Sequence, residues 1–277
     1  MKEEKTSKEE TKKKEERHAI LLSGFSRDYK KTLAKLKKNL RTAENVDLFI
    51  CFWDYTGTRD KKKHTSIKKK SGTPLIVCKD RSAGKVDKDK VAKDYQPTAL
   101  RIFDLDYTTD IIEPLSRIIE DTDVCPTGLK FSYQVTRGSL MFFLIKQTFL
   151  LMKSHEDKHN IRYKNVVRAR TDFVCGGYYP KVDWSRDYDD SILVGDWNWS
   201  GVNDYKINDH FAISSRENMK SYCMFYDHMH VATKKFITNE LKTTARGNTK
   251  AWSPEHMLAI YFKENKISFK RHRDKGP

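Results

Sequence analysis

Several sequence signals that would decide a function quickly are absent from this chain. Its cysteines lie far apart, and no Cys-x-x-Cys pair or Cys/His spacing of a zinc site occurs. An odd count of 5 cysteines in 277 residues indicates reduced thiols in a cytosol-like compartment rather than a disulfide framework. The cysteines are Cys51, Cys78, Cys125, Cys175 and Cys223.

Long apolar segments are missing as well. The longest apolar run, residues 140–152, is interrupted by Lys146 and Gln147 and is too short to span a bilayer. The N-terminus is charged and has no apolar stretch behind it, so no secretory signal peptide is expected. These absences predict a soluble, cytoplasmic protein without a transmembrane segment.

Signatures of sequence-specific nucleic-acid binding are also missing, although the formal net charge is +16. Such a charge admits nucleic acid, anionic membranes or phosphate-bearing substrates as partners, yet no helix-turn-helix, RNP or zinc-finger spacing occurs. Residues 60–95 hold twelve Lys or Arg against five Asp, a net charge of +7. We interpret residues 56–95 as a solvated basic insertion in which only residues 74–78 are strand-like. The charge alone nevertheless keeps a basic nucleic-acid-binding protein as one alternative function for this chain.

The remaining composition is that of a globular domain with a charged tail. Hydrophobic residues make up 38% and charged residues 33% of the chain. Residues 1–17 are almost all Lys, Glu, Thr and Ser and cannot bury a core, so we expect a disordered tail there. Order should begin near His18, and residues 18–277 are expected to form a single domain.

Apolar runs and helical periodicities alternate along this domain. Strands are expected at residues 19–22, 46–53, 100–103, 165–173, 192–196, 209–213 and 267–269. Helices are expected around residues 33–40, 111–119 and 131–153, from a capping box of Ser214 and Glu217 through His230, and from the cap Ser253 onward. The near-continuous apolar strands favour an α/β fold, with a mostly parallel sheet covered by helices on both faces.

The stretch at residues 165–173 combines a buried strand with charged side chains. Its β-branched start predicts a strand, and because side chains alternate along a strand, Arg168, Arg170 and Asp172 share one side. Such a strand end suits a polyanion held by the arginines and a divalent cation held by the aspartate. A plain Arg–Asp salt-bridge ladder is the alternative.

The first apolar run also ends in a suggestive turn. Residues 20–22 are followed by Ser23, Gly24 and, three positions on, Arg27, after which a helical pattern begins. A buried strand, a glycine-containing turn and a helix open many nucleotide-binding α/β domains. The alternative is an ordinary first βα unit.

The order of these parts resembles the GT-A-type nucleotide-sugar glycosyltransferases, in particular a group found in large DNA viruses, chloroviruses among them, and in bacterial polysaccharide clusters. The segments that carry the resemblance are residues 20–27, 47–53, the long helix with residues 166–173, residues 209–212 and residues 254–256. Together they span nearly the whole chain from residue 18.

The resemblance implies a GT-A-like, Rossmann-type fold with a mostly parallel central sheet flanked by helices. It further implies transfer of a sugar from a UDP-sugar donor to a glycan or glycoprotein acceptor, with inversion and the help of Mn²⁺ or Mg²⁺. Within the viral group it implies a xylosyltransferase acting on a capsid glycan in the host cytoplasm, without a specific nucleic-acid partner.

For the metal, the family's short acidic motif, usually Asp-x-Asp, falls on Arg170-Thr171-Asp172, so one acid is missing and arginine replaces it. The resemblance therefore assigns the metal to Asp172, assisted by a residue such as His256, or leaves part of the metal's work to arginines. The literal Asp-x-Asp of the chain, Asp104 and Asp106, precedes the long helix and is a minor alternative.

Sugar transfer also needs groups for the departing diphosphate and for the acceptor proton. The nucleotide-sugar-binding residues are expected to be Ser23, Gly24, Arg27, Arg168 and Arg170. The catalytic carboxylates are expected to be Asp209 and Glu255, with Asp196 third, and Trp197, Trp199 and Tyr205 are candidates for lining the acceptor site. The alternatives are a turn-forming role for Asp209, a helix-dipole role for Glu255 and ordinary packing for the aromatic residues.

A further alternative is another metal-dependent phosphate-processing enzyme, such as a nuclease, which would use the same acids. Enzymes of that class need a denser carboxylate cluster than this sequence offers.

Overall fold

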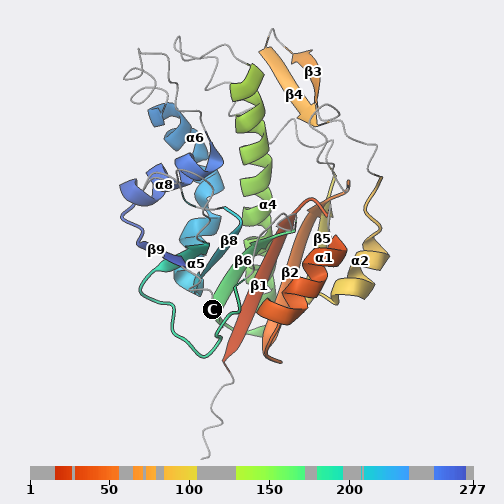
Figure 1. Ribbon diagram of the computed structural model, residues 1–277, viewed down its shortest axis with the longest axis vertical. Coiled ribbons are helices and arrows are strands. Elements are labelled where there is room, and N and C mark those ends of the chain that lie inside the picture. The colour runs from red at the N-terminus through yellow and green to blue at the C-terminus, as the bar shows by residue number, and fades with distance from the viewer. Residues whose placement is uncertain are drawn as a thin grey trace, which may run out of the picture.

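The computed structural model describes residues 16–26, 29–55, 65–70, 73–78, 84–104, 129–171, 180–195, 207, 209–236 and 253–272. Within these residues the chain forms a central sheet with helices on both sides (Figure 1). None of the described helices is long and apolar enough to cross a membrane.

The sheet has seven strands in the order β5-β2-β1-β6-β8-β7-β9. The strands are β1 (Arg17–Gly24), β2 (Val46–Trp53), β5 (Ala99–Phe103), β6 (Tyr163–Arg170), β7 (Ile192–Gly195), β8 (Phe211–Ser215) and β9 (Phe269–His272). Neighbouring strands are parallel except at β8, which is antiparallel to both β6 and β7. The expected mixed α/β fold with a mostly parallel sheet is therefore confirmed.

One face of the sheet is covered by the segments that connect its first strands. These segments are α1 (Tyr29–Lys35), the π-helical turn η1 (Leu36–Leu40) and α2 (Lys88–Tyr95). Leu36 and Val91 are buried against Ile20 and Val167 of the strands. Burial of such aliphatic side chains stabilises the fold by roughly 1.5–3 kcal/mol each.

Four later helices cover the other face. They are α4 (Leu129–His159), α5 (Arg216–Cys223), α6 (Phe225–Lys235) and α8 (Pro254–Glu264). Phe149 of α4 and Met219 of α5 are fully buried in the same cluster as Leu21 and Val166. Consecutive strand residues thus enter opposite cores, as expected for strands that are apolar on both faces.

The basic segment is more structured than the sequence predicts. It contains a hairpin of β3 (Thr65–Lys70) and β4 (Thr73–Cys78), with Lys70 opposite Thr73, and β4 lies beside α4 (Figure 1). Its last part is α2, which begins where the Asp87 carboxylate accepts a hydrogen bond from the Lys90 amide at 3.0 Å. Within the segment interpreted as a solvated basic insertion, α2 differs from that interpretation because it buries Val91 and Tyr95 in the core.

The helix expected from Ser214 through His230 also differs. Strand β8 continues to Ser215, and the Ser214 hydroxyl lies 3.2 Å from the carbonyl oxygens of Tyr188 and Ser191. Ser214 therefore cannot form the predicted capping box, and a turn at Met224 divides the helical region into α5 and α6. Packing of β8 between two strands outweighed the local capping pattern.

Two other helix predictions are confirmed. The Ser253 hydroxyl oxygen accepts a hydrogen bond from the His256 amide at 3.2 Å, and Pro254 is the first residue of α8. The long apolar helix expected at residues 131–153 is α4, which extends further at both ends. The cap fixes the start of α8, where two of the expected site residues lie.

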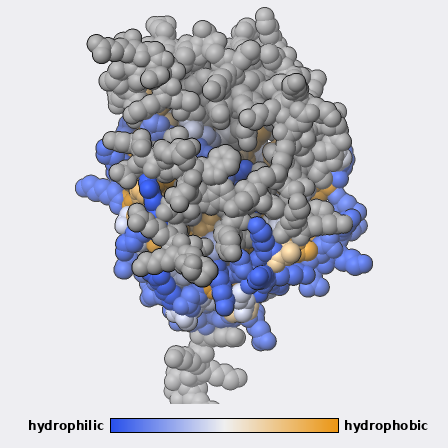
Figure 2. Space-filling model, in the orientation of Figure 1, coloured by the Kyte–Doolittle hydropathy of each residue, from blue (hydrophilic) through white to orange (hydrophobic). Residues whose placement is uncertain are grey.

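The described surface is mostly hydrophilic on the face seen in Figure 2, with apolar colour only in small separate areas. Among the described residues, the exposed large hydrophobic side chains are Leu150 and Val231, at 36% and 41% exposure. The described part of this face therefore presents no broad apolar docking surface.

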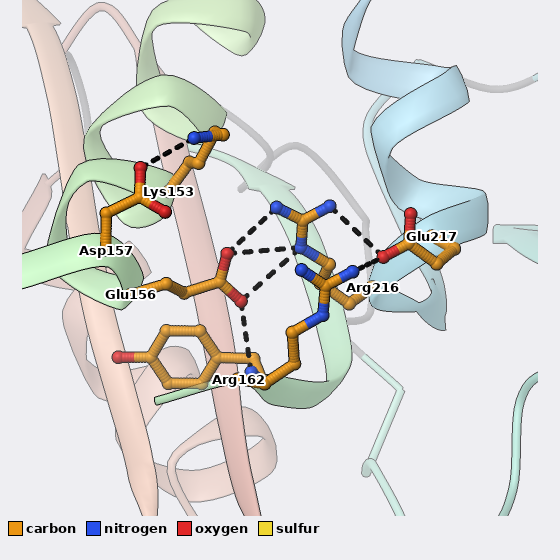
Figure 3. A network of polar contacts seen from close by, with 7 residues as sticks. Lys153, Glu156, Asp157, Arg162, Arg216 and Glu217 are labelled. Atoms are coloured by element: carbon orange, nitrogen blue, oxygen red, sulfur yellow. Dashed lines mark hydrogen bonds and ion pairs between the residues drawn. The ribbon is translucent and has the colours of Figure 1, made fainter. Parts of the chain in front are cut away.

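A buried ion pair joins α4 to α5 at the start of β6. Figure 3 shows Arg216 between Glu156 and Glu217. The Arg216 Nη2 and Nε atoms donate to Glu156 Oε2 at 2.9 and 3.1 Å, and the Tyr163 amide donates to Glu156 Oε1 at 3.1 Å. Arg162 also contacts Glu217. This network fixes the helices against the amino end of β6.

Replacing Arg216 with Met should lower the free energy of unfolding by about 3–5 kcal/mol, because the change leaves the Glu156 carboxylate buried without its cation. Urea denaturation measures this loss. Combining Arg216→Met with Glu156→Leu removes both charges and should recover most of the stability. An unchanged midpoint for the single variant would show that the pair contributes nothing to stability.

Candidate functional site

The candidate site lies where the strand order reverses. The chain leaves β1 towards β2 on one side, whereas β6 pairs with β1 on the other side. Ser23 is opposite Arg170 in the β1–β6 register, so the carboxyl ends of both strands meet (Figure 1). Ligands of open α/β sheets bind outside such strand ends at the reversal point. Ser23, Gly24 and Arg170, all expected to bind the nucleotide-sugar, are thus brought together.

Gly24 makes this close approach possible. Its φ of +133° is unfavourable for residues with a side chain, and a Cβ placed there would lie 3.0 Å from Thr171 Oγ1. The Thr171 hydroxyl donates to the Phe25 carbonyl, and the Thr32 hydroxyl donates to the Thr171 carbonyl. These bonds tie the turn after β1 and the helix α1 to the end of β6.

The arginines of β6 point towards the helices α4, α5, α6 and α8, because they alternate with Val167 and Ala169, which belong to the opposite core. Arg170 Nη1 donates to Asp209 Oδ2 at 2.9 Å, and His210 Nε2 lies 3.2 Å from Asp209 Oδ1. The Asp209 side chain is 3% exposed and that of Arg170 is 18% exposed. Arg170 is therefore ion-paired with Asp209, whereas the ladder weighed from the sequence involves Asp172, which lies outside the described residues.

Glu255 is a neighbour of this ion pair. It lies half-buried in the first turn of α8, and its carbonyl oxygen accepts a hydrogen bond from the Ile207 amide at 3.1 Å. Burial raises the pKa of the Glu255 carboxyl, and the negative charge of Asp209 raises it further. The two expected catalytic carboxylates therefore act on one another, although 46 positions separate them in the sequence.

Arg168 is completely buried behind Arg170. None of its three guanidinium nitrogens has a hydrogen-bond partner within the described part of the chain, and the same holds for the buried Tyr222 hydroxyl. Burial raises the pKa of the Tyr222 hydroxyl and of the Cys223 thiol, and the positive charge of Arg168 opposes both shifts. Arg168 is therefore enclosed by protein, and its contact with a nucleotide-sugar stays a prediction.

Sequence reasoning missed Tyr222 and His210 as members of this cluster. Tyr222 occupies a buried position of α5 and has no distinguishing neighbour in the sequence. His210 could have been included only because it adjoins Asp209. No sequence motif indicates a functional role for either residue.

The expected metal ligands are only partly described. His256 is buried at the start of α8, with its ring edge-to-face against Phe236 at a centroid distance of 5.3 Å. Within the described ranges, no three His, Cys, Asp or Glu side chains are grouped so that they could hold a metal ion. Those residues by themselves do not form a metal centre, so the prediction depends on Asp172.

The alternative acid Asp104 follows β5, which is the edge strand and lies two strands away from β1. Several other expected residues lie outside the described residues. These are Arg27, Asp106, Asp172, Asp196, Trp197, Trp199 and Tyr205.

Replacing Glu255 with Gln should change how stability depends on pH. Because its folded pKa is raised, the wild-type carboxyl favours folding fully below its ordinary value of 4.5, and this contribution is lost as pH rises through the raised value. The variant should therefore gain stability relative to wild type as pH increases. Urea unfolding at about pH 4 and about pH 8 measures the difference. Glu264→Gln, at the exposed end of α8, is the matched control; identical pH dependence of wild type and Glu255→Gln would contradict the prediction.

Comparisons with known proteins give no family assignment. No protein-family model matches the chain, and no curated protein matches it. A solved structure with some likeness is the apo-form glycosyltransferase GlyE from Streptococcus pneumoniae TIGR4, with 9% identity and a TM-score of 0.37. The match covers 92% of this chain and 45% of that chain, so this chain spans less than half of the GlyE chain's length. A likeness at this level carries no argument about function.

Proposed function

We propose that this protein is a glycosyltransferase that moves a sugar from a UDP-sugar donor to a glycan or glycoprotein acceptor. The observation that carries the proposal is the meeting of Ser23, Gly24 and Arg170 at the carboxyl ends of β1 and β6, where the strand order reverses. A phosphate-bearing ligand at this place would meet a partly exposed guanidinium. The sequence resemblance to nucleotide-sugar glycosyltransferases supplies the reaction class.

The charge of the cluster agrees with an anionic donor. Arg168 and Arg170 bring two positive charges, and Asp209 brings one negative charge that Arg170 partly neutralises. The diphosphate leaving group gains charge as its bond to the sugar breaks, and fixed positive groups stabilise that charge.

Glu255 is the proposed general base. In an inverting transfer, the acceptor hydroxyl oxygen attacks the anomeric carbon as the diphosphate leaves, and a carboxylate takes the hydroxyl proton. A raised pKa suits this role because it lies nearer the working pH. Asp209 is held by Arg170 and His210, which suits a positioning role beside the base.

The divalent cation and the sugar are proposed on the sequence resemblance. Asp172 and His256 are the proposed ligands of Mn²⁺ or Mg²⁺, and xylose is the proposed sugar. Chelation with EDTA should then lower the transfer rate, and Mn²⁺ should restore it. Equal transfer rates in EDTA and in Mn²⁺ would show that no metal takes part. The arginines alone would then be the proposed groups that stabilise the departing diphosphate.

The first experiment is a thermal-shift screen against UDP, GDP, CDP and their sugars, followed by a transfer assay with the sugar that binds. A ligand that binds only the folded state raises its stability. Glu255→Gln should lower kcat by roughly 10²–10⁴-fold with little change in KM, because the base acts in the transition state.

Glu264→Gln is the control, since it alters the same helix α8 away from the site and should keep wild-type kinetics. If the purified protein neither binds nor hydrolyses any nucleotide-sugar with Mn²⁺ present, the proposal fails. Binding of DNA or RNA that persists above moderate salt would favour the nucleic-acid alternative.

A further inference from the structure

The last turn of α4 carries two histidines on one side of the helix. Residues 155–159 read His-Glu-Asp-Lys-His, so His155 and His159 are four positions apart and are neighbours on the helix surface. Their ring centroids lie 4.2 Å apart, and the ring planes are inclined at 38°. His155 is half-buried and His159 is exposed, so solvent reaches the pair. Two histidines at this spacing on a helix, with glutamate after the first, form the arrangement in which metalloproteases bind Zn²⁺.

The His155 ring is held in place by the sheet. It packs edge-on against Phe49 of β2 at a centroid distance of 5.5 Å, and Phe49 is in turn edge-on to Tyr163 of β6. Within the described part of the chain, neither the His155 imidazole nor the His159 imidazole has a hydrogen-bond or ion-pair partner. The ring nitrogens of a partly fixed pair are therefore open to a ligand.

The electrostatic surroundings of the pair suit a bound cation. Burial lowers the pKa of the His155 imidazole, and the charge of His159 lowers it further. A lowered pKa favours the neutral imidazole, which is the form that binds metals. The pair also lies at the carboxyl end of α4, where the helix dipole favours positive charge. Asp47 attracts a cation near His155, whereas Arg17 and Lys158 oppose it.

The glutamate of this turn is engaged elsewhere. In metalloproteases the corresponding glutamate is the general base, which must reach the reacting water. Here the Glu156 side chain is 3% exposed and accepts hydrogen bonds from the Arg216 guanidinium and the Tyr163 amide (Figure 3). The residues that the structure describes also include no group of three His, Cys, Asp or Glu placed to hold a metal. The turn therefore offers two metal ligands without a base for peptide hydrolysis.

We propose that His155 and His159 bind one transition-metal ion, Zn²⁺, Ni²⁺ or Cu²⁺, with water in the remaining coordination positions. Two imidazoles that bind one ion at about 2.0–2.1 Å have ring centres roughly 4.5–5 Å apart, so only a small adjustment is needed. Imidazole nitrogen suits these three ions, whereas Mg²⁺ and Ca²⁺ prefer oxygen ligands. The bound ion would link two positions of the last turn of α4 and stabilise it.

This site is distinct from the proposed sugar-transfer site. Helix α4 ends at His159, and β6 begins at Tyr163, so the pair lies beside the amino end of β6. Ser23 and Arg170 lie at the carboxyl ends of β1 and β6. The inference therefore does not rest on the proposed function.

The test is calorimetric titration of the EDTA-dialysed protein with Zn²⁺, Ni²⁺, Cu²⁺ and Mg²⁺ at about pH 7.5, where free imidazole is neutral. His155→Gln and His159→Gln should each weaken the affinity for the transition metals by roughly tenfold or more, because the second ring binds intramolecularly. The double variant should bind no more weakly than the single variants. Mg²⁺ should give no binding that depends on either histidine.

The matched control is His228→Gln combined with His230→Gln. These two exposed histidines of α6 are two positions apart and do not face each other, so their removal should leave the affinity unchanged. Equal affinities of wild type and of the variant that lacks both His155 and His159 would overturn the proposal.

The ligands and the effect on stability can be measured separately. Electron paramagnetic resonance of bound Cu²⁺ should show splitting from two imidazole nitrogens in wild type and from one in His159→Gln. Zn²⁺ should raise the Tm of wild type, because it binds only the folded state, and should not raise that of the double variant. If His155→Gln unfolds because its ring leaves Phe49, the exposed His159→Gln alone still decides the test.

Two activity measurements complete the test. With Mn²⁺ present, the double variant should transfer sugar as wild type does, and a loss of transfer would overturn the separation of the two sites. Zn²⁺-dependent cleavage of casein by wild type, lost in both single variants, would overturn the assignment of a binding site without hydrolysis. If no sugar is transferred by any variant but Zn²⁺ affinity depends on both histidines, the metal site stands and the transferase is wrong.

Discussion

Ion-paired guanidinium groups lie at both ends of β6, and each pairs with a buried carboxylate, which would be strongly destabilising without a cation. At the amino end, Arg216 meets Glu156 and thereby fixes α5 against α4. At the carboxyl end, Arg170 meets Asp209 and holds the segment before β8 against β6. The positions of the helices and of the candidate site both depend on these pairings along one central strand.

The sheet could be predicted from the sequence because its strands carry their own signal. Residues 46–53 are an apolar run that is buried on both faces, residues 165–170 begin with two β-branched side chains, and the Ser253 cap acts within three residues of its own position. The capping box at Ser214 failed because the partners of that hydroxyl, Tyr188 and Ser191, are distant in sequence. A local sequence pattern can predict a hydrogen bond only between nearby residues, whereas strand pairing brought distant acceptors to the Ser214 hydroxyl.

The sequence also predicts those parts of the candidate site that lie at strand ends, but not the pairings between distant residues. Ser23, Gly24 and Arg170 follow apolar runs, so their convergence follows from the parallel arrangement of β1 and β6. The pairing of Arg170 with Asp209 spans 39 positions, and no periodicity links the two residues. The unmet hydrogen bonds of Arg168 and Tyr222 depend on helix α5 covering that strand face, which only the packed structure shows.

Depth along β6 separates two arginines that the sequence presents as equivalent. A strand rises about 3.3 Å per residue, so Arg170 lies roughly 7 Å nearer the carboxyl edge than Arg168. That distance leaves Arg170 partly exposed and encloses Arg168 completely. The partly exposed Arg170 is accessible to a ligand, whereas the enclosed Arg168 is not. Two residues of one type, on one face of one strand, therefore differ in their access to solvent because of their depth along the strand.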